Sequence, residues 1–191
     1  MADTFTIDVP VAGAYVCTLI TEQPHDWAFP IGSAEYPPEQ WYCATRHDPT
    51  GALNNGYRHT GIDINLDLSP WGDIERTLGL GVYAVADGVV THVSQNWYGP
   101  PMIVIRHEHE GEPLYTRYAH IVPVVTVGDK VTPGKFLGLF ADWATGDHLH
   151  LDMTRTPYTR EWFTGGMLDP IDVLKAHLPQ DKVDAMCKKG G

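Results

Sequence analysis

The chain has 191 residues, and its 24 acidic and 13 basic residues give a formal net charge of −11. A chain this acidic is a poor candidate for binding nucleic acid or an anionic membrane through bulk charge. Apolar residues make up 43% and charged residues 19% of the sequence, which argues against intrinsic disorder, and no stretch approaches the roughly 20 apolar residues that a membrane span needs.

The N-terminal segment and the cysteines say little about the cellular compartment. Residues 1–10 lack a basic start and an apolar run, so no secretory signal peptide is predicted. The three cysteines, Cys17, Cys43 and Cys187, are widely spaced and odd in number, which does not predict a disulfide framework. At this length one domain buries a core without disulfides, so we expect one domain with extensions.

The first part of the chain, residues 1–56, is rich in Pro, Gly and aromatic residues, and its prolines break any long helix. We predict an N-terminal extension that contains a long irregular excursion over residues 27–55. Loops of that length are usually functional or disordered, and the aromatic residues argue against disorder here.

Between residues 81 and 153 short apolar runs alternate with turns. An Asp-Gly pair at 87–88 separates two such runs, which is a strong hairpin signal. Many short strands at regular spacing predict an all-β sandwich or barrel. The expected strands cover residues 82–86, 89–94, 102–107, 114–118, 124–127, 136–140 and 148–153.

One helix is predicted near the C-terminus. Asp169 supplies an N-cap and Pro170 stands at the first helical position. Apolar residues three and four positions apart follow on one face, and Pro179 ends the helix. Residues 179–191 are then a C-terminal tail.

Histidine carries the chemical signal, because the chain has ten. In a strand the side chains alternate, so His148, His150 and Asp152 would share one face, with an apolar row opposite. Neutral imidazoles bind zinc well, and a nearby acid can orient the second ring nitrogen. The alternative is a half-buried strand whose histidines merely meet solvent.

A second motif, His59-x-x-x-Asp63, places another possible ligand pair four residues apart. Gly61 and its β-branched neighbours argue against a helix, so we expect a strand or a sharp turn. The alternative is a simple hydrogen bond between the two side chains at the surface. His120, after a predicted strand, says little by itself.

The pair His107-x-His109 is a decoy. Acidic residues surround it at positions 108, 110 and 112, next to Gly111 and Pro113. We interpret it as an exposed, solvated hairpin tip rather than a metal site.

Taken together, these motifs resemble the lysostaphin-type zinc metalloendopeptidases, peptidoglycan hydrolases that cut the peptides of bacterial cell walls. The resemblance runs from about His59 to Leu174 and keeps the order of the family's motifs. The matching segments are His59–Asp63, Val82–Val90, Val104–His107, Tyr118–Ile121, Val127–Gly134, Gly146–Asp152 and Asp169–Pro170.

The resemblance implies that one Zn²⁺ per chain is held by His59, Asp63 and His150. His120 and His148 would be catalytic histidines that do not bind the metal. Three ligands leave one tetrahedral position for water, which is typical of a catalytic zinc site. Because the chain has no H-E-x-x-H motif, no glutamate serves as base, and the two histidines must share proton transfer and oxyanion stabilisation.

The fold implied by the resemblance is all-β, a compact antiparallel β-sheet core with an open groove, of the duplicated hybrid motif type. The metallopeptidase core would span residues 57–178, and residues 27–55 and 65–80 would wall the groove. Two segments depart from the family pattern: the stretch before the His-x-His pair, 141–146, is bulky, and the connection after Asp63 is long. The candidates for contact with substrate are Tyr57, Trp71, Tyr118 and Trp143.

Two other functions compete with an active peptidase. A metal-free member of the same family would act as a cell-wall binding or regulatory module. Residues 127–138 also resemble a carrier domain for biotin or lipoate, but that interpretation leaves the histidines unexplained.

The expected partner is a peptidoglycan peptide, without nucleic acid or membrane insertion, and the expected place of action is the bacterial cell wall. A phage lysin or virion-borne enzyme fits the absent signal, as does a bacterial enzyme without its export region. The scissile bond (a glycine bridge or a D-alanyl–diaminopimelate link) and the oligomeric state are left open.

Overall fold

The computed structural model describes residues 26–32, 37, 40–53, 55–66, 80–96, 100–142, 147–157 and 166–187. Their strands are β1 (Trp41–Thr45), β2 (Ile62–Leu66), β3 (Gly81–Tyr83), β4 (Gly88–Ser94), β5 (Met102–His109), β6 (Glu112–Ala119), β7 (Ile121–Pro123), β8 (Lys130–Val131), β9 (Phe136–Phe140), β10 (Leu149–Thr154) and β11 (Met167–Leu168), and their helices are α1 (Pro170–His177) and α2 (Gln180–Cys187).

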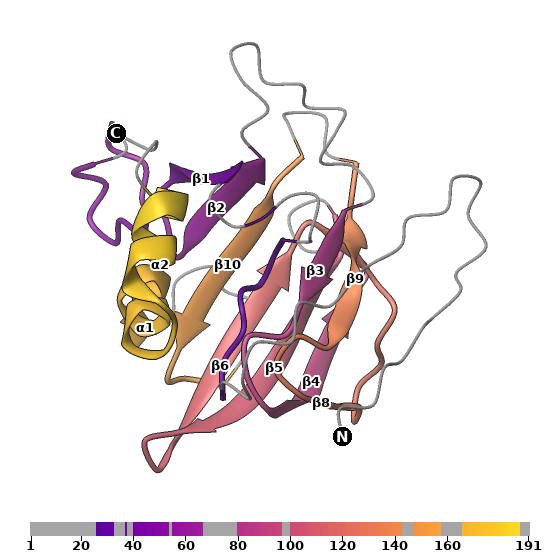
Figure 1. Ribbon diagram of the computed structural model, residues 1–191. Coiled ribbons are helices and arrows are strands. Elements are labelled where there is room, and N and C mark those ends of the chain that lie inside the picture. The colour runs from indigo at the N-terminus through magenta and orange to yellow at the C-terminus, as the bar shows by residue number, and fades with distance from the viewer. Residues whose placement is uncertain are drawn as a thin grey trace.

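Two antiparallel sheets make up the body of the molecule (Figure 1). The main sheet runs in the order β1-β2-β10-β6-β5-β4-β8, and β11 pairs with β10. The smaller sheet has the order β3-β9-β7. The expectation of an all-β fold with an antiparallel core is confirmed.

Strand β10 is the central element, because it lies between β2 and β6 and all six of its residues are buried. Side-chain alternation divides it into two faces. Leu149, Leu151 and Met153 belong to the hydrophobic core with residues of both sheets and both helices. The opposite face carries His150, Asp152 and Thr154, so the central strand presents a buried polar row.

The two helices lie side by side next to β1 and β10 (yellow in Figure 1). Helix α1 begins as predicted: the Asp169 carboxylate accepts a hydrogen bond from Ile171 N, and Pro170 is the first helical residue. Among the described residues, neither helix is long and apolar enough to span a membrane.

Three segments differ from what their sequences predict. Residues 41–45, inside the expected irregular excursion, form the edge strand β1. Residues 124–127, expected as a strand, follow β7 as an irregular segment that leads into a turn at 127–128, where the Asp129 carboxylate accepts hydrogen bonds from the amide and hydroxyl of Thr126. Residues 180–187, in the expected tail, form α2, whose apolar side chains at 183, 186 and 187 share one face and are buried.

Pro179 explains why helix α2 was not predicted. It ends α1, but it also precedes the first residue of α2, and its carbonyl accepts hydrogen bonds from Lys182 N and Val183 N. A proline favours a helix start as much as it prevents continuation. The division of the chain at residues 56 and 178 stays a prediction.

Candidate metal centre

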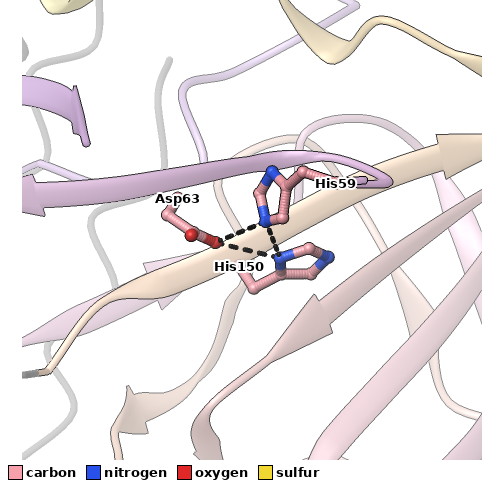
Figure 2. A group of neighbouring side chains, drawn as sticks. All are labelled: His59, Asp63 and His150. Carbon is pink, nitrogen blue, oxygen red and sulfur yellow. Dashed lines mark hydrogen bonds and ion pairs between the residues drawn. The ribbon is translucent and has the colours of Figure 1, made fainter. Parts of the chain in front are cut away.

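Strands β2 and β10, with the segment just before β2, bring the three predicted metal ligands together. The strands are antiparallel neighbours, and their register sets His150 directly opposite Asp63. His59 precedes β2, where its backbone exchanges two hydrogen bonds with Asp48. Figure 2 shows the side chains of His59, Asp63 and His150 turned toward one another.

The donor atoms of these residues converge closely. The Asp63 Oδ1 atom lies 2.9 Å from His150 Nδ1 and 3.2 Å from His59 Nε2, and the two ring nitrogens are 3.1 Å apart. Ligands that lie about 2.0–2.1 Å from a tetrahedral zinc ion stand about 3.3 Å from one another. The two imidazoles and one carboxylate therefore fit a zinc ion in both chemistry and spacing.

Gly61 allows this convergence. It stands between His59 and Asp63, where the chain comes very close to β10. A Cβ atom at position 61 would lie 2.1 Å from the Leu151 carbonyl oxygen, closer than any non-bonded contact allows. Glycine is therefore required by packing, and the residue does not form part of a helix, as its sequence setting predicts.

Hydrogen bonds to the outer ring nitrogens orient both imidazoles. The His59 ring donates its Nδ1–H to the carbonyl oxygen of Arg46 at 3.1 Å, which leaves Nε2 facing the centre. The His150 Nε2 atom lies 3.2 Å from Asp152 Oδ2, which leaves Nδ1 facing the centre. Thr60 donates its hydroxyl to the same Asp152 oxygen at 3.0 Å. Such supporting contacts fix the tautomer of a ligand and raise its basicity.

Sequence reasoning missed Arg117, which completes this support. It lies opposite Asp152 in the register of β6 with β10, and its guanidinium forms a bidentate ion pair with the Asp152 carboxylate. The side chains are 1% and 0% exposed. An arginine in an expected strand with aromatic residues on both sides of it, at 115 and 118, was the available signal, since a buried cation needs a carboxylate partner.

The protonation of the cluster follows from its burial and hydrogen bonds. Burial pushes the pKa of Asp63 upward, but hydrogen bonds from His150 and His59 outweigh it and hold that pKa well below its usual range. Burial also pushes the pKa of His150 downward, but its bonds to Asp152 and Asp63 raise that pKa to about 9. A cation at this position is therefore stabilised, and a metal ion must displace a proton to bind.

The two predicted catalytic histidines lie beside the cluster. The rings of His120 and His148 are 4.6 Å apart, and His148 Nε2 is 3.6 Å from Asp63 Oδ1. His120 forms the corner between β6 of the main sheet and β7 of the smaller sheet, with a left-handed φ of 63°. Burial, together with the charges of His148 and His150, lowers the pKa of His120 to about 3.

The candidates for substrate contact fall in different places. Tyr57 is 80% exposed, just before His59. Tyr118 is fully buried, and its hydroxyl accepts a hydrogen bond from Val85 N at 2.9 Å, so it supports the core instead of facing a groove. Trp71 and Trp143 lie outside the described residues, as does most of the expected wall over residues 65–80.

The interpretation of His107 and His109 as an exposed tip is wrong. Strand β5 continues through both residues, which are 1% and 9% exposed. His107 hydrogen-bonds to the Asp87 carbonyl and the Thr116 hydroxyl at 2.7 and 2.8 Å. His109 contacts His177 of α1 at 2.8 Å. Tertiary packing covers the two side chains, and neither belongs to the only cluster of potential metal ligands found in the described part of the chain.

Structural comparison shows that the fold is similar to that of lysostaphin. The chain is 21% identical to lysostaphin over 81% of its own length and 56% of the lysostaphin chain, with a TM-score of 0.59. It therefore spans little more than half of that protein. Against the catalytic domain of lysostaphin from Staphylococcus simulans, identity is 23%, coverage 75% of this chain and 98% of the domain, and the TM-score 0.55.

A third similar structure has a different setting, the SpoIIQ–SpoIIIAH pore-forming complex. Identity is 15%, coverage 83% of this chain and 94% of that one, and the TM-score 0.56. No curated protein sequence matches the chain significantly. The sequence model of peptidase family M23 matches residues 57–162, a segment that contains His59, Asp63, His120, His148 and His150. The chain therefore belongs to peptidase family M23.

Proposed function

We propose that this protein is a zinc metalloendopeptidase that hydrolyses the peptide cross-links of bacterial peptidoglycan, with one zinc ion per chain. The observation that carries the proposal is the convergence of His59, Asp63 and His150 donor atoms within 2.9–3.2 Å of one another. Membership of a peptidase family supports hydrolysis of a peptide bond. The similarity of the fold to lysostaphin, described as an antimicrobial peptidase, supports a substrate in the bacterial wall.

We assign the roles of the zinc ion, His120 and His148 from the exposure and charge of the side chains at the site. A zinc ion held there would polarise the scissile carbonyl and lower the pKa of a bound water toward about 7. The buried, neutral His120 suits donation of a hydrogen bond to the developing oxyanion. The His148 side chain keeps 17% of its surface exposed, so it suits proton exchange with substrate and solvent.

The alternative is a family member that binds the wall or a protein partner without catalysis. A similar fold occurs in a pore-forming complex, which supports a binding role as the second candidate function. All five expected positions nevertheless carry competent side chains, which supports the peptidase. A place of action at the cell wall, and origin from a phage or a bacterium, are further parts of the proposal that follow from the substrate.

The test combines metal content with product analysis. Protein purified without chelator is expected to contain about one zinc per chain, and His59→Ala and Asp63→Ala to lose it, while His92→Ala on β4 serves as the matched control. Mass spectrometry of muropeptides released from several purified walls, with and without chelator, identifies the bond. Active protein without metal would contradict the zinc assignment, and zinc-loaded protein that releases no muropeptide would contradict the substrate.

A further inference from the structure

Two cysteines that are far apart in the chain meet at the edge of the main sheet. The Sγ atoms of Cys43 on β1 and Cys187 at the end of α2 are 3.1 Å apart, although 144 positions separate the residues. Both are free thiols, 0% and 6% exposed. Their separation in the sequence predicted no disulfide framework, but the fold places them in direct contact.

The contact depends on how α2 packs. Val183, Met186 and Cys187 form the buried face of the helix, which lies on β1. Arg46, just beyond β1, donates from Nη2 to the Cys187 carbonyl oxygen at 2.9 Å. The last residue of α2 is therefore held to the edge strand by both its side chain and its backbone.

The surroundings give the two thiols different reactivity. A hydrogen bond joins the two sulfur atoms, and this contact raises the pKa of Cys43 and lowers that of Cys187. The positive charges of Arg46 and Lys175 also lower the pKa of Cys187. A thiolate with such neighbours is the nucleophile in thiol–disulfide exchange.

A cavity lies next to Cys187, and a small reagent that enters it comes close to the end of α2. It has a volume of about 540 Å³, and Cys187 is part of its wall. The other lining residues are Arg46, Ile171, Lys175, Asp181 and Asp184. The cavity is therefore lined mainly by charged groups, two cations and two carboxylates, of which Lys175 and Asp184 form an ion pair at 2.6 Å.

We propose that Cys43 and Cys187 are a redox site, which a small peptide disulfide converts to a disulfide bond that fastens α2 to the edge of the main sheet. The Cys187 thiolate attacks one sulfur of the reagent, which leaves a mixed disulfide on Cys187 and releases one reagent thiolate. Cys43 then loses its proton and attacks the Cys187 sulfur, which forms the Cys43–Cys187 bond and releases the second thiolate. The protein is oxidised by two electrons and the reagent is reduced to two thiols.

The bond would also steady the metal centre. Arg46 connects the end of α2 with the cluster of predicted metal ligands. Its side chain donates a hydrogen bond to the Cys187 carbonyl, and its own carbonyl accepts a hydrogen bond from His59 Nδ1–H. Fastening α2 to β1 restrains Arg46, and through it the ring that faces the cluster. This connection depends on contacts within the chain and holds whether or not the protein is a peptidase.

The experiment treats the full chain with oxidised glutathione in the Cys17→Ser background, which leaves only the proposed pair. Peptide mapping without reductant is expected to find Cys43 linked to Cys187. The melting temperature should rise by roughly 4–16 °C on oxidation, as is typical when a disulfide closes a long loop in a chain of this size. The Cys43→Ser/Cys187→Ser variant in the same background is the matched control and should melt at the same temperature with either form of glutathione.

Single variants test the order of the two steps. Cys43→Ser should keep glutathione on Cys187, whereas Cys187→Ser should remain largely unmodified. Absence of the Cys43–Cys187 peptide, or a linked form that melts no higher than the reduced one, would overturn the proposal. Stable glutathione on Cys43 in the Cys187→Ser variant, with none on Cys187 in Cys43→Ser, would overturn the assigned order.

Discussion

Arg117 and Asp152 form a fully buried bidentate ion pair across β6 and β10, next to His150 of the cluster of predicted metal ligands. The Asp152 carboxylate also contacts His150 Nε2, so a single anion serves two cationic partners. Burial pushes the pKa of Asp152 upward, but the hydrogen bond with His150 and the charge and hydrogen bonds of Arg117 hold that pKa below its usual value. The pair thus links the stability of the sheet to the orientation of His150.

Replacing Asp152 by Asn separates these two effects. We expect zinc affinity to fall by about 10–100-fold, because the supporting carboxylate of a ligand is lost. The variant should also lose roughly 3–5 kcal/mol of unfolding free energy, because Arg117 is left as an uncompensated buried charge. Zinc titration and urea unfolding measure the two quantities.

The double variant Arg117→Met/Asp152→Asn is the control for this prediction. Removing the cation as well should restore most of the stability, since buried ion pairs are often replaceable by apolar groups. Zinc affinity should stay low. If affinity recovers together with stability, the carboxylate acts only through the fold and not on His150.

His120 and His148 are expected to act in catalysis without holding the metal. His120→Ala and His148→Ala should retain about one zinc per chain and lose activity by roughly 10²-fold or more. Elemental analysis and the rate of muropeptide release check this. Loss of metal from His148→Ala together with its retention in His150→Ala would mean that the two roles are reversed.

The left-handed backbone of His120 gives a second, independent prediction. Its φ of 63° is costly for any residue with a Cβ atom. His120→Gly should therefore be more stable than His120→Ala by about 1 kcal/mol in urea unfolding, although both lack the imidazole. Equal stabilities would argue that the corner between β6 and β7 adopts another conformation.

Stability should fall in mild acid because of His107. Burial lowers its pKa from 6.5 to about 4, against the opposing hydrogen bond to the Asp87 carbonyl. The unfolded chain therefore takes up a proton at a higher pH than the folded one, so the contribution of His107 is complete above about pH 6.5 and is lost as the pH falls toward 4. The loss is about 3 kcal/mol. His107→Gln should flatten the pH dependence of unfolding free energy in this window, and an unchanged slope would show that other groups cause it.

Gly61→Ala tests the close approach of β2 to β10. Since a Cβ atom would meet the Leu151 carbonyl at 2.1 Å, the strands must separate, and both zinc binding and stability should drop sharply. Gly111→Ala is the matched control, because nothing lies within 4 Å of a Cβ there and only its positive φ is strained. That control should cost roughly 1 kcal/mol and keep zinc. Normal zinc binding by Gly61→Ala would contradict the packing argument.

Local patterns in the sequence predict one strand of the site but not its assembly. Alternation correctly puts His150 and Asp152 on one face of β10 and Leu149 on the other. The register that sets His150 opposite Asp63 joins segments 87 residues apart, so no local pattern contains it. Only the resemblance to a known family suggested that these residues meet.

The failures have a common physical cause, which is burial by distant segments. The acidic neighbours of His109 predicted an exposed side chain. The rings of Trp27 and His177 contact it instead, and these two residues lie far from it in the sequence, one near each end of the described part of the chain. The partner of Arg117 could not be identified from the sequence, because Asp152 is on another strand. Helix α2 could have been found from Val183 and Met186, whose helical spacing marks its buried face.

The separation of Asp63 and His150 by 87 residues also bears on the order of folding. Bringing such distant segments together costs chain entropy, and the contacts that β10 makes with β2 and β6 offset that cost. The donor atoms therefore meet only after the central strand is in place. The metal site is therefore a property of the paired sheet, and an unfolded chain holds its three donor residues too far apart in the sequence to bind one ion together.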